Sequence, residues 1–183
     1  MYEYNNNELR FWDGRMPFAQ RVSIAAAQRQ LVDVLARARD RIDEEFGPRT
    51  WKWLDEPATS FARCQDGDDQ GWEDSSRQGM TTGMSIAFFP RLLEIAAEEV
   101  APHGFTRIVD VSDEDRWVDI FNVEDGGYVG VVHTRDTLPF SMRYATGCRP
   151  ETRRPGPSSA EGTPCEPDAI VSACSCLCMP LPR

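Results

Sequence analysis

Residues 105–146 read FTRIVDVSDEDRWVDIFNVEDGGYVGVVHTRDTLPFSMRYAT. Apolar and aromatic residues alternate here in four short runs, which predict strands at 105–111, 117–123, 128–134 and 138–146. Asp125-Gly126-Gly127 predicts a tight hairpin turn between the second and third strands, because glycine adopts a positive φ without steric cost. This stretch therefore predicts an antiparallel meander at the C-terminal end of a folded domain.

Two helical patterns precede the meander. Apolar residues recur every three or four positions from Phe18 to Phe46, which predicts an amphipathic helix that ends at Gly47-Pro48. Pro90 fits the first turn of a second helix that runs to about Val100. The order of helix, strands, helix and meander favours an α+β fold, in which a mostly antiparallel sheet packs against two helices. The other face of that sheet is expected to be partly in contact with water.

The region between the two helices gives weaker signals. Residues 50–54 alternate and are rich in tryptophan, which predicts a strand, and residues 61–64 form a second short strand candidate. Residues 65–79 are acidic and contain glycine, so we expect a loop there. Alternation returns at residues 80–88 and predicts one more strand.

Composition divides the chain into three parts. Residues 1–17 show no apolar period and are expected to form an irregular lead-in, and residues 18–149 form the predicted α+β domain. Residues 149–183 hold seven of the 13 prolines and four of the six cysteines. We therefore expect residues 150–183 to be a disordered tail that contains proline and cysteine.

The charge balance excludes some classes of partner. The chain has 30 acidic and 20 basic residues, a formal net charge of -10, so a phosphate backbone would be repelled and nucleic acid is not an expected partner. Nineteen of the basic residues are arginine and one, Lys52, is lysine. No apolar run reaches the roughly 18 residues that a membrane-spanning helix needs.

Candidate metal sites are incomplete. Residues 66–74 resemble the start of an EF-hand calcium loop, but Arg77 stands where a bidentate carboxylate is required. The tail segment Cys174-Ser175-Cys176-Leu177-Cys178 lacks the C-x₂-C spacing of structural zinc sites. We therefore predict no metal ligand and no cofactor, and we expect the acidic segment to be a solvated loop.

No catalytic motif is present either. The sequence has neither a G-x-S-x-G elbow nor a phosphate-binding glycine loop, so we predict no catalytic residue. His133 is in phase with Val129 and Val131 on a predicted strand and faces the core or the rim of the sheet. Two alternatives stay open: a soluble enzyme or metal-dependent protein that uses His133 or residues 66–74, and a cytosolic interaction module that uses the open face of the sheet.

Cys64 and Cys148 differ from the four tail cysteines because each lies at the end of a predicted strand. A bridge between them would close a loop of about 85 residues and stabilise the fold by about 4–5 kcal/mol, less any strain. Two buried thiols fit the same pattern. The residues alone leave both states open.

Four features along residues 25–148 carry a resemblance to a known family. They are Phe46-Gly47-Pro48 at a helix end, the tryptophan strand at 50–55, the passage from 85–88 into the helix at 95–100 with its stop at Gly104, and the closing Thr146-Gly147-Cys148. In these features the chain resembles the LppA-like lipoproteins of actinobacteria. The cysteine-bearing tail departs from that family's pattern.

The resemblance implies a non-enzymatic cell-envelope domain that binds an envelope partner or a small ligand, in which Cys64 and Cys148 are bridged. It also implies an extracytoplasmic protein held at the plasma membrane through an N-terminal lipid anchor. No signal peptide or lipobox precedes Met1 in the sequence as given. An upstream start, a trimmed chain and a cytosolic protein are therefore the alternatives for the N-terminus.

Overall fold

The structure is a computed structural model that describes residues 14–52, 62–134 and 139–151. The chain divides into two compact units, Met1–Thr152 and Arg153–Arg183, and all of the described residues belong to the first.

A five-stranded antiparallel sheet forms the centre of the domain. Its strands, in spatial order, are β3 (Ser75–Thr81), β7 (Phe140–Ala145), β6 (Tyr128–His133), β5 (Arg116–Asn122) and β4 (Phe105–Asp110). The last four strands along the chain are neighbours in the sheet, so the predicted meander is confirmed. The α+β fold class is confirmed with it.

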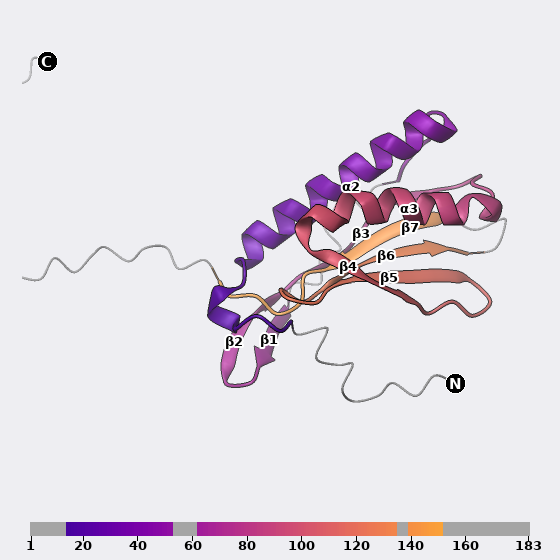
Figure 1. Cartoon of the computed structure of the whole chain (residues 1–183). Coiled ribbons are helices and arrows are strands. Elements are labelled where there is room, and N and C mark those ends of the chain that lie inside the picture. Colours follow the sequence, from indigo (N-terminus) through magenta and orange to yellow (C-terminus); the bar gives the residue numbers. More distant parts are fainter. Residues whose placement is uncertain (1–13, 53–61, 135–138, 152–183) are drawn as a thin grey trace, which may run out of the picture. The chain divides into compact units, whose positions relative to one another are not determined.

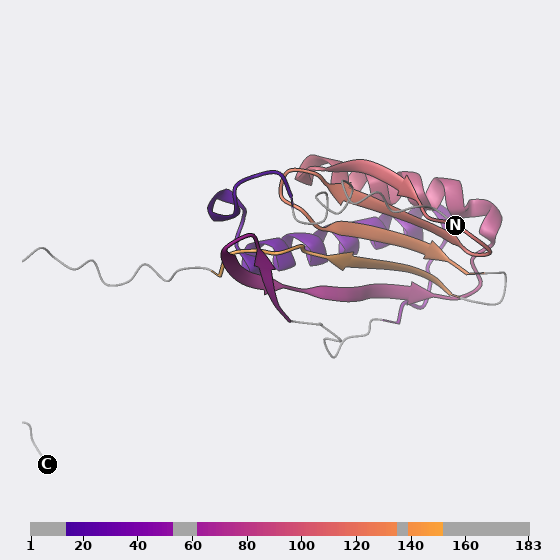
Figure 2. The same ribbon diagram turned by 90° about the horizontal axis from the view of Figure 1, so that it is seen from below.

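Two helices, α2 (Ile24–Phe46) and α3 (Phe89–Val100), lie together on one face of this sheet (Figure 1). The view from below shows the strands in front and both helices behind them, so neither α2 nor α3 covers the outer face (Figure 2). The core lies between the two layers and includes Leu31, Leu35, Ile42, Leu92, Ile95, Val118, Ile120, Val131, Phe140 and Met142. None of the helices described has both the length and the apolar character to cross a membrane.

The first long helix begins later than its apolar period predicts. A single 3-10 turn, η1, covers Phe18–Gln20, and α2 begins at Ile24. Arg21 between them is extended, and its side chain is buried in hydrogen bonds to three backbone carbonyl groups. Ser23 then caps the helix by accepting a hydrogen bond from the N–H of Ala26. The extended backbone at Arg21, whose side chain bonds to those carbonyl acceptors, therefore separates η1 from the start of α2.

The prediction of a loop over residues 65–79 is wrong. The strands β1 (Ala62–Asp66) and β2 (Asp69–Glu73) form an antiparallel hairpin, and β3 follows at once and pairs with β7. The hairpin strands are polar or half-buried on both faces. Apolar alternation could not reveal them, because backbone pairing and a covalent link, rather than burial of an apolar face, hold them in place.

The prediction of a strand over residues 80–88 is also wrong beyond its first two residues. Strand β3 ends at Thr81, and Gly83 has a φ of 74°, which reverses the chain and lets Met84 enter the core. The 3-10 turn η2 (Ile86–Phe88) then leads directly into α3.

Of the predicted strand at 50–54, the structure shows one bridge, between Lys52 and Met80, and residues 53 and 54 lie outside the described part.

Candidate functional site

His133 lies on the inner face of the sheet and is fully buried. Its Nε2 is 2.8 Å from the carbonyl oxygen of Met84, and its Nδ1 is 2.8 Å from the carbonyl oxygen of Thr134. Both partners are acceptors, so in either neutral tautomer one ring nitrogen donates a hydrogen bond to its carbonyl oxygen. His133 therefore connects the end of β6 to the segment before α3, and neither nitrogen is available to a substrate.

The acidic residues at 66–74 face different partners. Asp66 forms an ion pair with Arg21 at the tip of the β1–β2 hairpin. Asp74 is fully buried and accepts a hydrogen bond of 2.6 Å from the hydroxyl of Tyr144 on β7. Burial, together with this carboxylate, raises the pKa of Tyr144 above its ordinary range. The first and ninth positions of the calcium-like pattern thus serve the fold, and the described residues contain no metal-binding group of three or more His, Cys, Asp or Glu.

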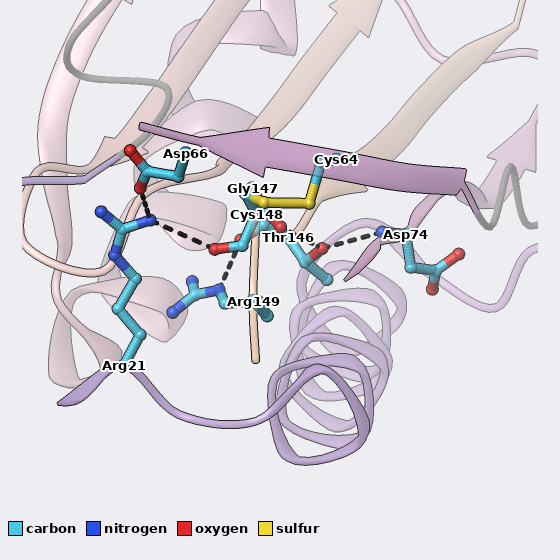
Figure 3. Close-up of a disulfide and its surroundings, with 8 residues drawn as sticks. All are labelled: Arg21, Cys64, Asp66, Asp74, Thr146, Gly147, Cys148 and Arg149. Atoms are coloured by element: carbon cyan, nitrogen blue, oxygen red, sulfur yellow. Dashed lines mark hydrogen bonds and ion pairs between the residues drawn. A yellow bond between two sulfur atoms is a disulfide. The ribbon is translucent and has the colours of Figure 1, made fainter. Parts of the chain in front are cut away.

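A disulfide joins Cys64 on β1 to Cys148, which follows β7 (Figure 3). The two Sγ atoms are 2.05 Å apart and the Cα atoms 5.7 Å apart, and the two cysteines are 84 positions apart in the sequence. The bond attaches the β1–β2 hairpin to the C-terminal end of the folded domain.

Arg21 lies beside this disulfide and is almost completely buried. Its guanidinium donates to the carbonyl oxygens of Met16, Gly14 and Cys148 at 2.9, 3.1 and 3.3 Å, and it pairs with Asp66. One side chain thereby connects the segment before α2, the hairpin and the segment after β7. Figure 3 shows the contacts of Arg21 with Asp66 and Cys148 on one side of the disulfide.

Arg149 also lies beside the disulfide and is 1% exposed. Its Nε donates to the carbonyl oxygen of Thr146 at 2.7 Å, its Nη2 donates to that of Gly126 at 2.9 Å, and its Nη1 lies 3.1 Å from a carboxylate oxygen of Asp125. Burial lowers the pKa of Arg149, and Asp125 opposes this effect. Its backbone also pairs with Trp72 of the hairpin.

We call the set Arg21, Cys64, Asp66, Cys148 and Arg149 the clasp. Arg21 and Arg149 carry no sequence signal, because arginine is abundant throughout the chain, and Asp66 is marked only as the first position of the incomplete calcium-like pattern.

A second polar cluster lies on the outer face of the sheet. The indole Nε1–H of Trp117 donates to Asp119 at 2.9 Å, and the guanidinium carbon of Arg143 lies 3.9 Å from the centre of the Trp117 ring. Gly130 makes this packing possible, since a Cβ there would lie 2.7 Å from Nε of Arg143 and 2.8 Å from Oδ1 of Asp119. Burial raises the pKa of Asp119, although the hydrogen bond from Trp117 and the charge of Arg143 oppose it.

Sequence reasoning missed this second cluster. Trp117 and Asp119 alternate on one strand, but their contact with Arg143 depends on the pairing register of β5, β6 and β7.

Two solved structures share the fold. A DUF4853 family protein from Actinomyces odontolyticus is 22% identical and aligns over 75% of this chain and 75% of its own, with a TM-score of 0.56. The putative lipoprotein LppA from Mycobacterium tuberculosis is 18% identical and aligns over 70% of this chain and 78% of its own, with a TM-score of 0.54. At these identities the likeness concerns the fold alone. No curated protein matches the chain.

The family model for LppA, described as a lipoprotein confined to pathogenic Mycobacterium, matches residues 12–151. The match covers both helices, the sheet, the hairpin and all five residues of the clasp. It agrees with the resemblance seen in the sequence, and because it spans most of the chain, the protein belongs to the LppA family of lipoproteins.

Proposed function

We propose that this protein is an extracytoplasmic domain, held at the plasma membrane by a lipid anchor, which has no catalytic role and binds another component of the cell envelope or a small ligand. The observation that carries the proposal is the disulfide between Cys64 and Cys148 at the centre of the clasp. Structural disulfides form and persist in oxidising compartments and are rare where thiols are kept reduced. Membership of a lipoprotein family supports the same location.

In such a location the clasp can keep the β1–β2 hairpin attached to the rest of the domain. The β1–β2 hairpin has no continuous apolar face, and its strand residues are mostly exposed or half-buried. An isolated two-stranded hairpin is marginal in water at best. The disulfide keeps this hairpin on the domain, with help from the Arg21–Asp66 ion pair and the Trp72–Arg149 bridge. A domain of this design suits a compartment in which the bond stays oxidised.

The positions of the candidate catalytic groups favour binding over catalysis. Both nitrogens of His133 lie 2.8 Å from backbone carbonyl oxygens inside the core. Asp66 and Asp74 are bonded to Arg21 and Tyr144. A general base must reach the proton that it abstracts, and these three side chains are directed to partners within the fold.

Differential alkylation of protein from its native cell tests the proposal. Free thiols are blocked in intact cells, the disulfides are then reduced and labelled with a second reagent, and peptides are mapped. We expect Cys64 and Cys148 to carry the second label, and the protein to be recovered with the membrane fraction and to be degraded by protease added outside the membrane. A Cys64→Ser variant is the control, because its Cys148 should then carry the first label.

Two outcomes would contradict the proposal. First labels on both Cys64 and Cys148 in the wild-type protein would show that the native compartment does not maintain the bridge. Recovery of unlipidated protein from the cytosol would contradict the location directly.

A further inference from the structure

A cavity of about 220 Å³ opens on the outer face of the sheet, opposite the helices. Its described lining includes Lys52, Met80, Trp117, Val132, Ser141 and Arg143. None of the features assigned so far to the fold or the clasp uses this space.

The floor of the cavity is one continuous row of cross-strand partners. Lys52 faces Met80, Met80 faces Ser141, Ser141 faces Val132, and Val132 faces Trp117. Partners across antiparallel strands project to the same side of a sheet, so the side chains of the row share the outer face.

The sequence neighbours of Lys52 and Trp117 confirm that the row faces away from the core. Trp51, next to Lys52, contacts Phe140 on the core side with ring centres 6.2 Å apart, and Val118, next to Trp117, is buried in the core. Lys52 and Trp117 therefore stand at the two ends of a shallow trough, with Met80, Ser141 and Val132 between them.

One wall of the trough is held in place before any ligand arrives. Asp119 accepts the indole hydrogen of Trp117 and fixes the ring, while Arg143 stacks on the face of that ring and lies over Gly130. The Nη2 atom of Arg143 is 3.7 Å from Asp119, and its Nε has no hydrogen-bond partner among the described residues. A wall whose rotamers are already fixed loses little entropy on binding.

The charge of the trough is opposite to that of the chain. The protein has a formal net charge of -10, yet the described lining of the trough contains two cations, Lys52 and Arg143. The carboxylate of Asp119 lies 3.7 Å from Arg143 and offsets its charge, so Lys52 is the cation that is offered to a ligand. Between the cations lie the apolar surfaces of Met80, Val132 and the indole of Trp117. An apolar site with a few converging polar groups is the usual form of a small-molecule site.

We propose that this trough binds a small organic carboxylate with an apolar body. The carboxylate lies beside Lys52 at one end of the trough, and the apolar body lies across Met80 and Val132 toward Trp117. The volume is below the roughly 300–1,000 Å³ typical of pockets for drug-sized ligands, which favours a compact acid. The inference rests on the binding role proposed above and names the class of ligand for it.

Lys52 supplies a single spectroscopic probe, because it is the one lysine in the chain. Reductive methylation of the full chain with ¹³C-formaldehyde labels only Lys52 and the α-amino group, and it keeps both charges. We expect titration with 3-phenylpropionate to shift the Lys52 signal in a saturable manner while the α-amino signal stays in place. Acetate lacks the apolar body and 3-phenylpropanol lacks the charge. The affinity for each should therefore be lower than that for 3-phenylpropionate by at least about tenfold.

Calorimetry on unlabelled variants identifies the residues. Lys52→Met removes the charge and keeps the length of an exposed side chain, and it should weaken binding of 3-phenylpropionate about tenfold. Arg29→Met is the matched control, since Arg29 is an exposed cation on α2 on the other side of the sheet, and it should bind like the wild type. Trp117→Leu should also weaken binding, with circular dichroism used to verify that each variant is folded.

Three results would overturn the inference: no saturable shift of the Lys52 signal up to the solubility limit of the probe, an equal response to acetate, or equal affinity in Lys52→Met and Arg29→Met. The titration does not depend on the compartment in which the protein resides. A bridged, membrane-bound protein with no affinity for the probe would therefore leave the proposed location standing and end this inference alone.

Discussion

Tyr144 donates its hydroxyl hydrogen to the carboxylate of Asp74 across 2.6 Å, and both side chains are buried. The bond links β7 to the junction of β2 and β3, 70 positions away in the sequence. The main chain at this junction is bonded as well, since Asp74 and Thr146 exchange two hydrogen bonds of 2.8 and 2.9 Å. The carboxylate thus has a defined place at the edge of the core.

We expect Tyr144→Phe to lower the free energy of unfolding by about 1–3 kcal/mol, because it leaves a buried carboxylate oxygen without its donor. Urea unfolding followed by fluorescence measures the change. In the double variant with Asp74→Asn the loss should be smaller, because a neutral amide is less costly than a carboxylate to bury without a partner. Equal stabilities of the single variant and the wild type would show that the bond contributes nothing.

Reduction of the disulfide should destabilise the domain by about 4–5 kcal/mol, less any strain, because the bond closes a long loop in the unfolded chain. Urea unfolding with and without a reductant gives the difference. The variant with Cys64→Ser and Cys148→Ser is the control, and its unfolding should be insensitive to reductant even though four tail cysteines are present. A reductant effect of equal size in that variant would locate the stabilising bond elsewhere.

His133→Phe should destabilise the domain by about 1–3 kcal/mol while keeping a ring in the same space, because it removes the ring N–H that donates to the carbonyl oxygen of Met84 or Thr134. Thermal unfolding by calorimetry provides the measurement. His103→Phe is a suitable comparison, since His103 is half-exposed and its ring contacts Arg37 at the surface, and a much smaller change is expected there. Equal losses in both variants would contradict the structural role of His133.

Asp119 should make stability depend on pH. Its pKa in the folded state is raised above the ordinary value of 3.8, so the folded state binds the proton more tightly than the unfolded state. The contribution of Asp119 to stability must therefore fall as pH rises from about that ordinary value through the folded-state pKa. We expect the unfolding free energy of the wild type, minus that of Asp119→Asn, to decrease as the pH rises over this interval. A difference that rises with pH would mean that Arg143 and Trp117 outweigh burial.

Periodicity in the sequence predicts the parts of the fold that bury an apolar face. The meander and both long helices are of this kind, since alternation along β5 to β7 and the stripe on α2 reflect direct contact with the core. Periodicity predicts a start for α2 that is too early, because the spacing of apolar residues carries no information about the acceptors that Arg21 requires.

Strands held by other means escape this kind of prediction. β1 and β2 have no apolar face, and β3 begins with two serines that pair with the edge of β7. Their positions depend on contacts across the chain, above all on Cys64 and Arg149. The resemblance to a family predicts the pairing of Cys64 with Cys148. The burial of Arg21 and Arg149 could not be predicted, because nothing in the neighbouring sequence distinguishes them from the other arginines.

The residues of the trough could not be predicted from the sequence for the same reason. Lys52 and Trp117 lie 65 positions apart in the sequence, and they share one cross-strand row only because four successive registers align. A one-residue slip in any of these pairings would send half of the row into the core.

The clasp also brings the two ends of the domain together. The backbone of Arg15 and Met16 donates to the carbonyl oxygens of Val123 and Glu124, and Arg149 bonds to Gly126 of the same turn. A short peptide could therefore join the ends, and a circular permutant could open instead at the exposed residues 113–114 without cutting a strand. Because its ends are adjacent, the domain could be inserted into a surface loop of a longer polypeptide, and both the host and the domain could still fold.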